Sequence, residues 1–152
     1  MGTHQSQIAT LSTSPDAGER LKALQLMRQR IECGDPPADY LALALPLIED
    51  PGNDCRWQAL VVVGESLPTN PAAVWDVICR YGDSSDEDMR AGVATVLLEH
   101  LLEHHFDAYF PRLKERIEAG AVLLADTLSS CWRFDLSEEQ WSKVRELGTR
   151  RP

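Results

Sequence analysis

The chain contains 152 residues, and its 24 acidic residues outnumber its 15 basic residues, which gives a formal net charge of −9 at pH 7. An acidic surface repels a phosphate backbone, so this balance argues against nucleic-acid binding and favours a basic partner. The apolar runs are far shorter than the ~20 residues of a membrane span, the amino-terminal residues show no secretory signal pattern, and the four cysteines are scattered. These features predict a cytoplasmic protein with reduced thiols and no membrane contact.

The first predicted helix follows a polar start. Residues 1–13 are polar and lack an apolar period, so we expect a flexible tail there. Ser14-Pro15 is typical of a helix start, because the hydroxyl can cap free N–H groups and proline suits the first helical position. Apolar residues then recur at three- and four-residue spacing up to a stop at Gly34. This helix opens a single predicted domain over residues 14–148.

The next helices are separated by strong helix breakers. A helix is expected over residues 37–48, and Pro46 should bend or break its last turn because proline cannot donate a backbone hydrogen bond. Breakers at 50–53 precede a long apolar helix over residues 54–67. Pro71 then opens a further helix with a clear apolar side.

The second half of the chain also predicts helices and no strand. The expected elements are a long helix over 86–104, a helix over 106–119 bent at Pro111, a shorter helix over 121–131, and a final helix opened by a capping box of Ser137 and Gln140 and ended at Gly148. Trp132 and Trp141 are expected to seal the carboxyl-terminal end of the domain, ahead of a short basic tail over 149–152. The predicted fold class is therefore all-α.

Several of these helices share one design at near-constant spacing. Arg20, Arg56 and Arg90 each lead into an apolar helix and stand 36 and 34 residues apart, a period typical of helical-repeat arrays. Two of these helices begin with an Asp-x-Arg pattern, from Asp54 to Arg56 and from Asp88 to Arg90. With these patterns, paired helices and proline-bent first helices, residues 16–119 resemble HEAT (armadillo-type) repeats.

This resemblance implies an α-solenoid of helical hairpins, in which the last two helices cap the carboxyl-terminal end. It also implies that Asp54, Arg56, Asp88 and Arg90 bridge adjoining repeats, which is a structural role. Gly18 stands where the first repeat should have its aspartate, so the repeats are degenerate.

A short metal-binding motif lies in the long helix. His100, Glu103 and His104 read H-x-x-E-H, a spacing that can place two imidazoles on one metal ion with a carboxylate to polarise a bound water. So short a motif has a high false-positive risk, and no downstream carboxylate matches the third ligand of the family that carries it. We therefore expect no metal and no other cofactor. A metal-dependent hydrolase built on these three residues is the alternative from a different functional class.

Four carboxylates form the predicted partner-binding surface. Glu65 and Glu99 hold equivalent repeat positions, so stacking of the repeats should bring them side by side. Glu103 lies one turn beyond Glu99, and Asp107 extends the line. A solvated acidic face explains the same charges equally well.

The sequence contains no recognisable catalytic group. No Ser/His/Asp or Cys/His arrangement and no glycine-rich phosphate loop stands out. The prediction is therefore a non-enzymatic protein–protein interaction module that binds a basic protein through an acidic concave surface. An immunity-type inhibitor, which neutralises a basic toxin by covering its active face, is the alternative among binding proteins.

Overall fold

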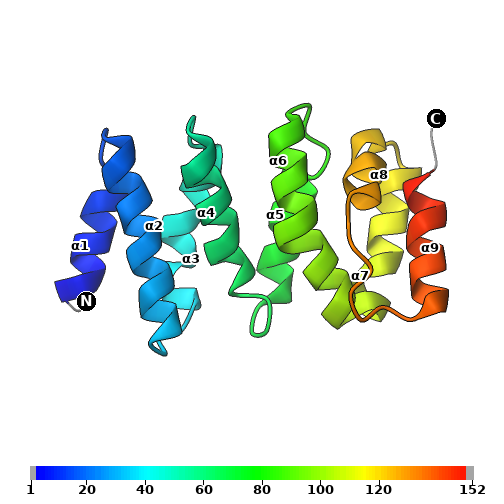
Figure 1. Ribbon diagram of the computed structural model, residues 1–152, viewed down its shortest axis with the longest axis horizontal. Coiled ribbons are helices and arrows are strands. Elements are labelled where there is room, and N and C mark those ends of the chain that lie inside the picture. The colour runs from blue at the N-terminus through cyan, green and yellow to red at the C-terminus, as the bar shows by residue number, and fades with distance from the viewer. Residues whose placement is uncertain (1–2, 150–152) are drawn as a thin grey trace. The chain divides into compact units, whose positions relative to one another are not determined.

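The computed structural model describes residues 3–149, and the chain divides into two compact units, unit 1 (Met1–Asn70) and unit 2 (Pro71–Pro152). Every regular element within residues 3–149 is a helix, which confirms the predicted all-α class (Figure 1). No helix in this range is both long enough and apolar enough to cross a membrane. The basic tail predicted over 149–152 lies outside the described residues, apart from Thr149.

Unit 1 consists of short helices packed side by side. They are α1 (Thr3–Ser12), α2 (Ala17–Glu32), α3 (Ala38–Ala44), the 3₁₀ helix η1 (Leu45–Glu49) and α4 (Asn53–Gly64). α2 packs against α1 and α4, while α3 and η1 also pack against α4. The core between them contains the fully buried side chains of Leu24, Met27, Tyr40, Ile48 and Leu60.

The flexible tail predicted over residues 1–13 is wrong for residues 3–12, which form α1. Ile8 is only 2% exposed and Ser12 is also buried, because α1 packs against α2 and α3. An isolated short helix is marginally stable in water, so packing rather than local pattern stabilises this segment. With few apolar residues, its helical period could not be read from the sequence.

Two helix ends in unit 1 follow the predictions. Gly34 adopts a φ of 105° just after α2, and its N–H donates to the Ile31 carbonyl oxygen at 2.9 Å. The next N–H, of Asp35, reaches back to the Arg30 carbonyl oxygen at 3.0 Å, which completes a Schellman motif. The break expected at Pro46 is the change from α3 to the 3₁₀ geometry of η1.

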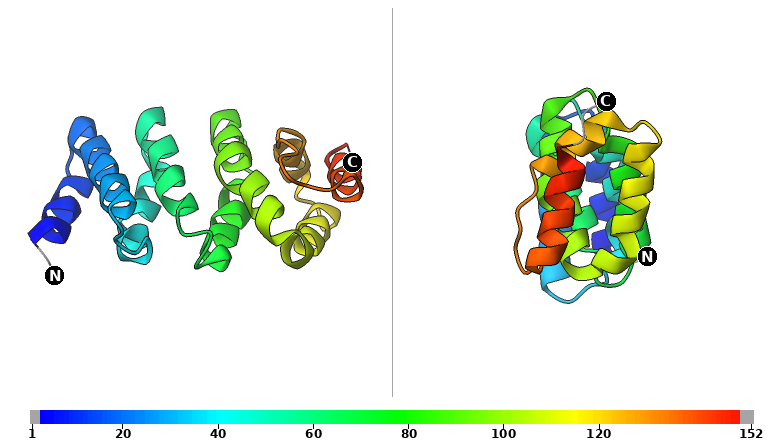
Figure 2. Two further views of the ribbon diagram at one scale, coloured as in Figure 1. Left: turned by 60° about the horizontal axis from the view of Figure 1, so that its bottom comes forward. Right: turned by 90° about the vertical axis from the view of Figure 1, so that its right-hand side faces the viewer.

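Unit 2 is also helical throughout its regular elements. They are α5 (Pro71–Tyr81), α6 (Glu87–Gly92), the π-helix η2 (Val93–Leu98), α7 (Glu99–Glu118), α8 (Val122–Ser129) and α9 (Glu138–Gly148). η2 packs against α5 and α8, and α8 packs against α7 and α9. A connection without helix joins α8 to α9 (Figure 2). The capping box predicted for Ser137 and Gln140 is confirmed at the start of α9.

The long helix predicted over 86–104 forms, but its geometry is not uniform. α6 passes into η2 and then into α7 without a break. A π-helix has more residues per turn than an α-helix, so η2 rotates the residues after it away from the positions that a 3.6-residue period assigns. The predicted junction at 104–106 is a kink at His105, where φ is −137° and ψ is 36°.

The turn between α5 and α6 is fixed on α8. Thr127 Oγ1 donates to the Gly82 carbonyl oxygen at 2.6 Å, and the Leu124 N–H donates to Asp83 Oδ1 at 3.0 Å. Gly82 is buried there, and a Cβ at this position would lie 2.7 Å from Leu124 Cδ1. Only a residue without a side chain therefore allows this approach.

Candidate functional site

Three helix starts share one local arrangement. In each, a side-chain oxygen accepts the backbone N–H two residues later: Ser14 Oγ from Asp16 at 3.1 Å, Asp50 Oδ1 from Gly52 at 2.8 Å, and Ser84 Oγ from Asp86 at 3.1 Å. The donating residue is the N-cap of α2, α4 or α6, and an arginine follows four residues after it. The sequence pattern indicated the arginines and the Ser14 hydroxyl but not the equivalent oxygens of Asp50 and Ser84, although these repeat at the same spacing.

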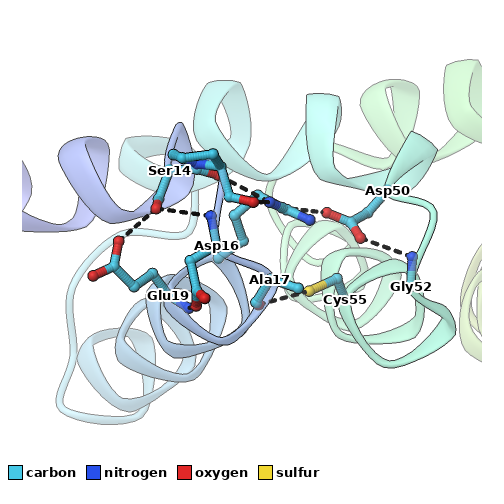
Figure 3. Close-up of polar contacts among 9 residues, drawn as sticks. Ser14, Asp16, Ala17, Glu19, Asp50, Gly52 and Cys55 are labelled. Atoms are coloured by element: carbon cyan, nitrogen blue, oxygen red, sulfur yellow. Dashed lines mark hydrogen bonds and ion pairs between the residues drawn. The ribbon is translucent and has the colours of Figure 1, made fainter.

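Asp50 lies in the turn before α4 (Figure 3), where it pairs with Arg20 of α2. Arg20 Nε lies 2.6 Å from Asp50 Oδ2, and the two side chains are 15% and 2% exposed. Hydrogen bonding from Arg20, with a smaller contribution from the Gly52 N–H, lowers the pKa of the Asp50 carboxyl below its usual value. The aspartate is therefore a fixed, ionised structural group.

The Asp-x-Arg residues lie in the first turns of α4 and α6. Asp54 is exposed, while Arg56 donates to Asn53 Oδ1 at 3.4 Å and Arg90 donates to the Ser84 carbonyl oxygen at 2.6 Å. Arg20 and Asp50 form an ion pair between distant segments of unit 1. The bridging of adjoining repeats by Asp54, Arg56, Asp88 and Arg90 stays a prediction.

The four carboxylates of the predicted binding surface have different surroundings. Glu65 is exposed just after α4 in unit 1, and its position beside Glu99 stays a prediction. Glu103 is largely buried, with 13% of its side chain exposed. Asp107 is exposed and lines a groove of about 510 Å³ between α7 and α9, whose apolar side includes the stacked rings of Phe106 and Phe110.

We expected Glu99 to be a surface carboxylate, and this prediction is wrong because its side chain is buried. Its side chain is 5% exposed, and Oε2 accepts the backbone N–H of Trp132 at 2.9 Å. Burial raises the pKa of Glu99, and the Trp132 N–H opposes part of that rise. The expectation came from the equivalence of Glu99 and Glu65 in the repeat, and repeat spacing does not record that the connection after α8 covers Glu99 through Trp132.

The histidines of the H-x-x-E-H motif both lie near the carboxylate between them. His100 Nδ1 is 3.4 Å from Glu103 Oε2, and His104 Nε2 is 3.6 Å from the same oxygen. Within residues 3–149, no group of three or more His, Cys, Asp or Glu side chains is arranged to hold a metal ion. This geometry gives no support to a metal-dependent step.

The connection between α8 and α9 carries the most exposed large apolar side chains of the described residues. Trp132 is 72% exposed and Phe134 is 51% exposed. The prediction that Trp132 seals the end of the domain is therefore wrong, whereas Trp141 is half-buried. We call Trp132 and Phe134 the aromatic surface.

Ordered contacts hold the aromatic surface in place. The Trp132 N–H is bound by the buried Glu99, and the Phe134 ring packs against His100 with 5.3 Å between ring centroids. Phe134 has a φ of 45°, a left-handed conformation that is uncommon outside glycine. The neighbouring Cys131 thiol is buried, and burial raises its pKa, so it stays in the unreactive thiol form.

The chain matches no protein-family model, no curated protein and no solved structure.

Proposed function

We propose that this protein is a non-enzymatic, cytoplasmic interaction module that binds a protein partner through the aromatic surface. The carrying observation is that Trp132 is 72% exposed on a segment whose backbone is held by the buried Glu99. Exposed apolar groups cost free energy in water, and tryptophan is enriched where protein interfaces gain most of their affinity. A net charge of −9 favours a basic protein as the partner.

We also propose that the chain is a degenerate HEAT-like repeat protein. The support is the common arrangement of the starts of α2, α4 and α6, each with a side-chain cap two residues before the N-cap and an arginine four residues after it. One supersecondary unit repeated along a chain is the design of helical-repeat proteins. A crystal structure of the intact chain tests whether successive helix pairs stack as an α-solenoid.

Site-specific photo-crosslinking tests the proposed binding surface. A photoreactive phenylalanine analogue replaces Trp132 in one variant and Val122 in the control, because Val122 is an exposed apolar residue of the same unit at 40% exposure. In extract of the source organism, we expect one discrete crosslinked protein at position 132 and none at position 122. Trp132→Ala and Phe134→Ala should each weaken capture without lowering Tm by more than roughly 2 °C, since exposed side chains contribute little to stability. Equal crosslinking at both positions, or none at 132, would rule the surface out.

A further inference from the structure

Two carboxylates beside the aromatic surface have no lysine or arginine partner within the described residues. Glu99 and Glu103 lie one turn apart on α7, with side chains that are 5% and 13% exposed. Their ionic neighbours are imidazoles: His100 Nε2 lies 3.9 Å from Glu99 Oε1, and both His100 and His104 approach Glu103. Carboxylates this little exposed are usually paired with a cation, because burial penalises an isolated charge.

The cation nearest along the connecting segment is already engaged. Arg133 stands between Trp132 and Phe134 in sequence, but its Nη1 lies 2.7 Å from Glu138 Oε2 and its Nε donates to the Leu136 carbonyl oxygen at 3.1 Å. The guanidinium is therefore directed toward the start of α9. Arg133 therefore pairs with neither carboxylate of α7.

The aromatic surface lies next to Glu99 and Glu103, two carboxylates without a lysine or arginine partner among residues 3–149. Phe134 packs on His100, which lies between Glu99 and Glu103, and Trp132 is bound to Glu99 through its backbone. The face of an aromatic ring attracts a cation, and tryptophan does so most strongly. A lysine or arginine side chain has an apolar stem and a charged head, which fits rings next to a carboxylate.

We propose that the aromatic surface binds a basic peptide segment, in which one lysine or arginine lays its stem on Trp132 and Phe134 and brings its charge to Glu103. This inference rests on the proposed function and identifies the chemistry of its partner. Glu103 is the counter-ion because Glu99 is more deeply buried and already accepts the Trp132 N–H. An ion pair at so weakly solvated a carboxylate is stronger than one in open solvent.

The test uses NMR spectra of the full chain, with synthetic peptides as probes. The tryptophan indole N–H peaks are assigned by single Trp→Phe variants, so that Trp132 reports on the aromatic surface and Trp57 in unit 1 serves as the internal reference. Three probes are titrated: a peptide alternating lysine and leucine, the same peptide with glutamate for lysine, and one with glutamine for lysine. The chain carries either native Glu103, Glu103→Gln, or the control Glu115→Gln, which removes an exposed carboxylate of the same helix.

We expect the lysine peptide to shift the Trp132 indole peak, with little change at Trp57. Glu103→Gln should weaken this binding about tenfold and Glu115→Gln by less than about twofold, because only Glu103 faces the bound cation. Equal effects of the two variants would overturn the inference, since they would mean binding by net charge alone. Equal binding of the glutamine or glutamate peptide would overturn it too, but would leave an apolar protein-binding surface intact.

Two further outcomes separate this inference from the proposed function. If no peptide shifts Trp132 while crosslinking at position 132 still captures a protein, the basic segment is wrong and the interaction module stands. If the Trp132 peak instead shifts with protein concentration alone, the occupant is a second copy of the chain, and the inference also fails.

Discussion

Replacement of Gly82 by alanine provides the sharpest test of how unit 2 is packed. A Cβ built at Gly82 lies 2.6 Å from the Ile78 carbonyl oxygen and 2.7 Å from Leu124 Cδ1, well inside the 3.4 Å at which ordinary contacts begin. Leu124 is 1% exposed and has little space into which it can move. The Ile78 oxygen accepts the Gly82 N–H at 2.8 Å, so moving it away weakens that hydrogen bond.

The expected cost follows from these contacts. Overpacking a tight site costs about 1–3 kcal/mol, and weakening a backbone hydrogen bond adds about 1 kcal/mol. Alanine also reduces the conformational freedom of the unfolded chain, which returns about 0.4–1 kcal/mol. We therefore expect Gly82→Ala to lower the free energy of unfolding by about 1–3.5 kcal/mol, which for a chain of this size lowers Tm by roughly 2–14 °C.

The measurement is urea unfolding followed by far-ultraviolet circular dichroism, with Gly18→Ala as the matched control. Gly18 lies exposed in the first turn of α2, and its new Cβ would meet only Oδ1 of Asp16, at 3.1 Å, the oxygen that accepts the Glu19 N–H; a shift of a few tenths of an ångström relieves this contact. Alanine is the better helix former, so this control should be neutral or more stable by up to about 1 kcal/mol. If Gly82→Ala is as stable as the native chain, the packing of the α5–α6 turn on α8 has been misjudged.

Further predictions concern buried polar groups. Asp50→Asn should lower the free energy of unfolding at pH 7, measured in urea. Arg20 lowers the pKa of Asp50, so the difference in unfolding free energy between the variant and the native chain should be constant above the unfolded pKa of about 3.9. That difference should vanish as the pH falls through the lower pKa of the folded state. A difference that persists in strong acid would argue against the ion pair as its cause. Burial raises the pKa of Glu99, so the stability of the native chain should fall as pH rises from the unfolded pKa of about 4.3 through the higher pKa of the folded state. Glu99→Gln should remove that fall in a pH series of melting curves, while its side-chain oxygen still accepts the Trp132 N–H. Ser66 is 1% exposed and its hydroxyl has no partner among the described residues, so Ser66→Ala should be neutral or more stable by up to about 1 kcal/mol in calorimetry, and a marked loss would mean that the hydroxyl is bound after all.

The helices could be predicted largely because their ends carry local chemistry. Gly34, Pro46 and the Ser137 capping box each act through their own backbone geometry, so the sequence pattern and the structure agree at these positions. α1 was missed because its stability comes from burying Ile8 against other helices, which no local pattern records. The stacking of the helices into an α-solenoid remains a prediction.

The candidate site was harder to predict, for two physical reasons. Trp132 and Phe134 lie in a connection without a helical or strand period, and without a period the sequence gives no indication of which side chains face solvent. Glu99 was placed on the surface by its equivalence to Glu65 in the repeat, and that spacing does not record its burial beside the Trp132 backbone. A signal that could have been used is the repeated spacing of Ser14, Asp50 and Ser84, which matches that of the arginines.

The π-helix η2 has a consequence for how this chain tolerates insertions and deletions. A π turn holds one residue more than an α turn, so removing one residue within Val93–Leu98 would restore regular α geometry. Residues after the deletion would keep their orientation relative to α6, because the residue removed is the extra one that the π turn accommodates. Glu99 would therefore keep its bond to the Trp132 N–H. A one-residue deletion in the regular turns of α6 would instead rotate everything after it by about 100° and take Glu99 away from Trp132. Single-residue deletions should therefore preserve binding when they fall within η2 and abolish it when they fall within α6.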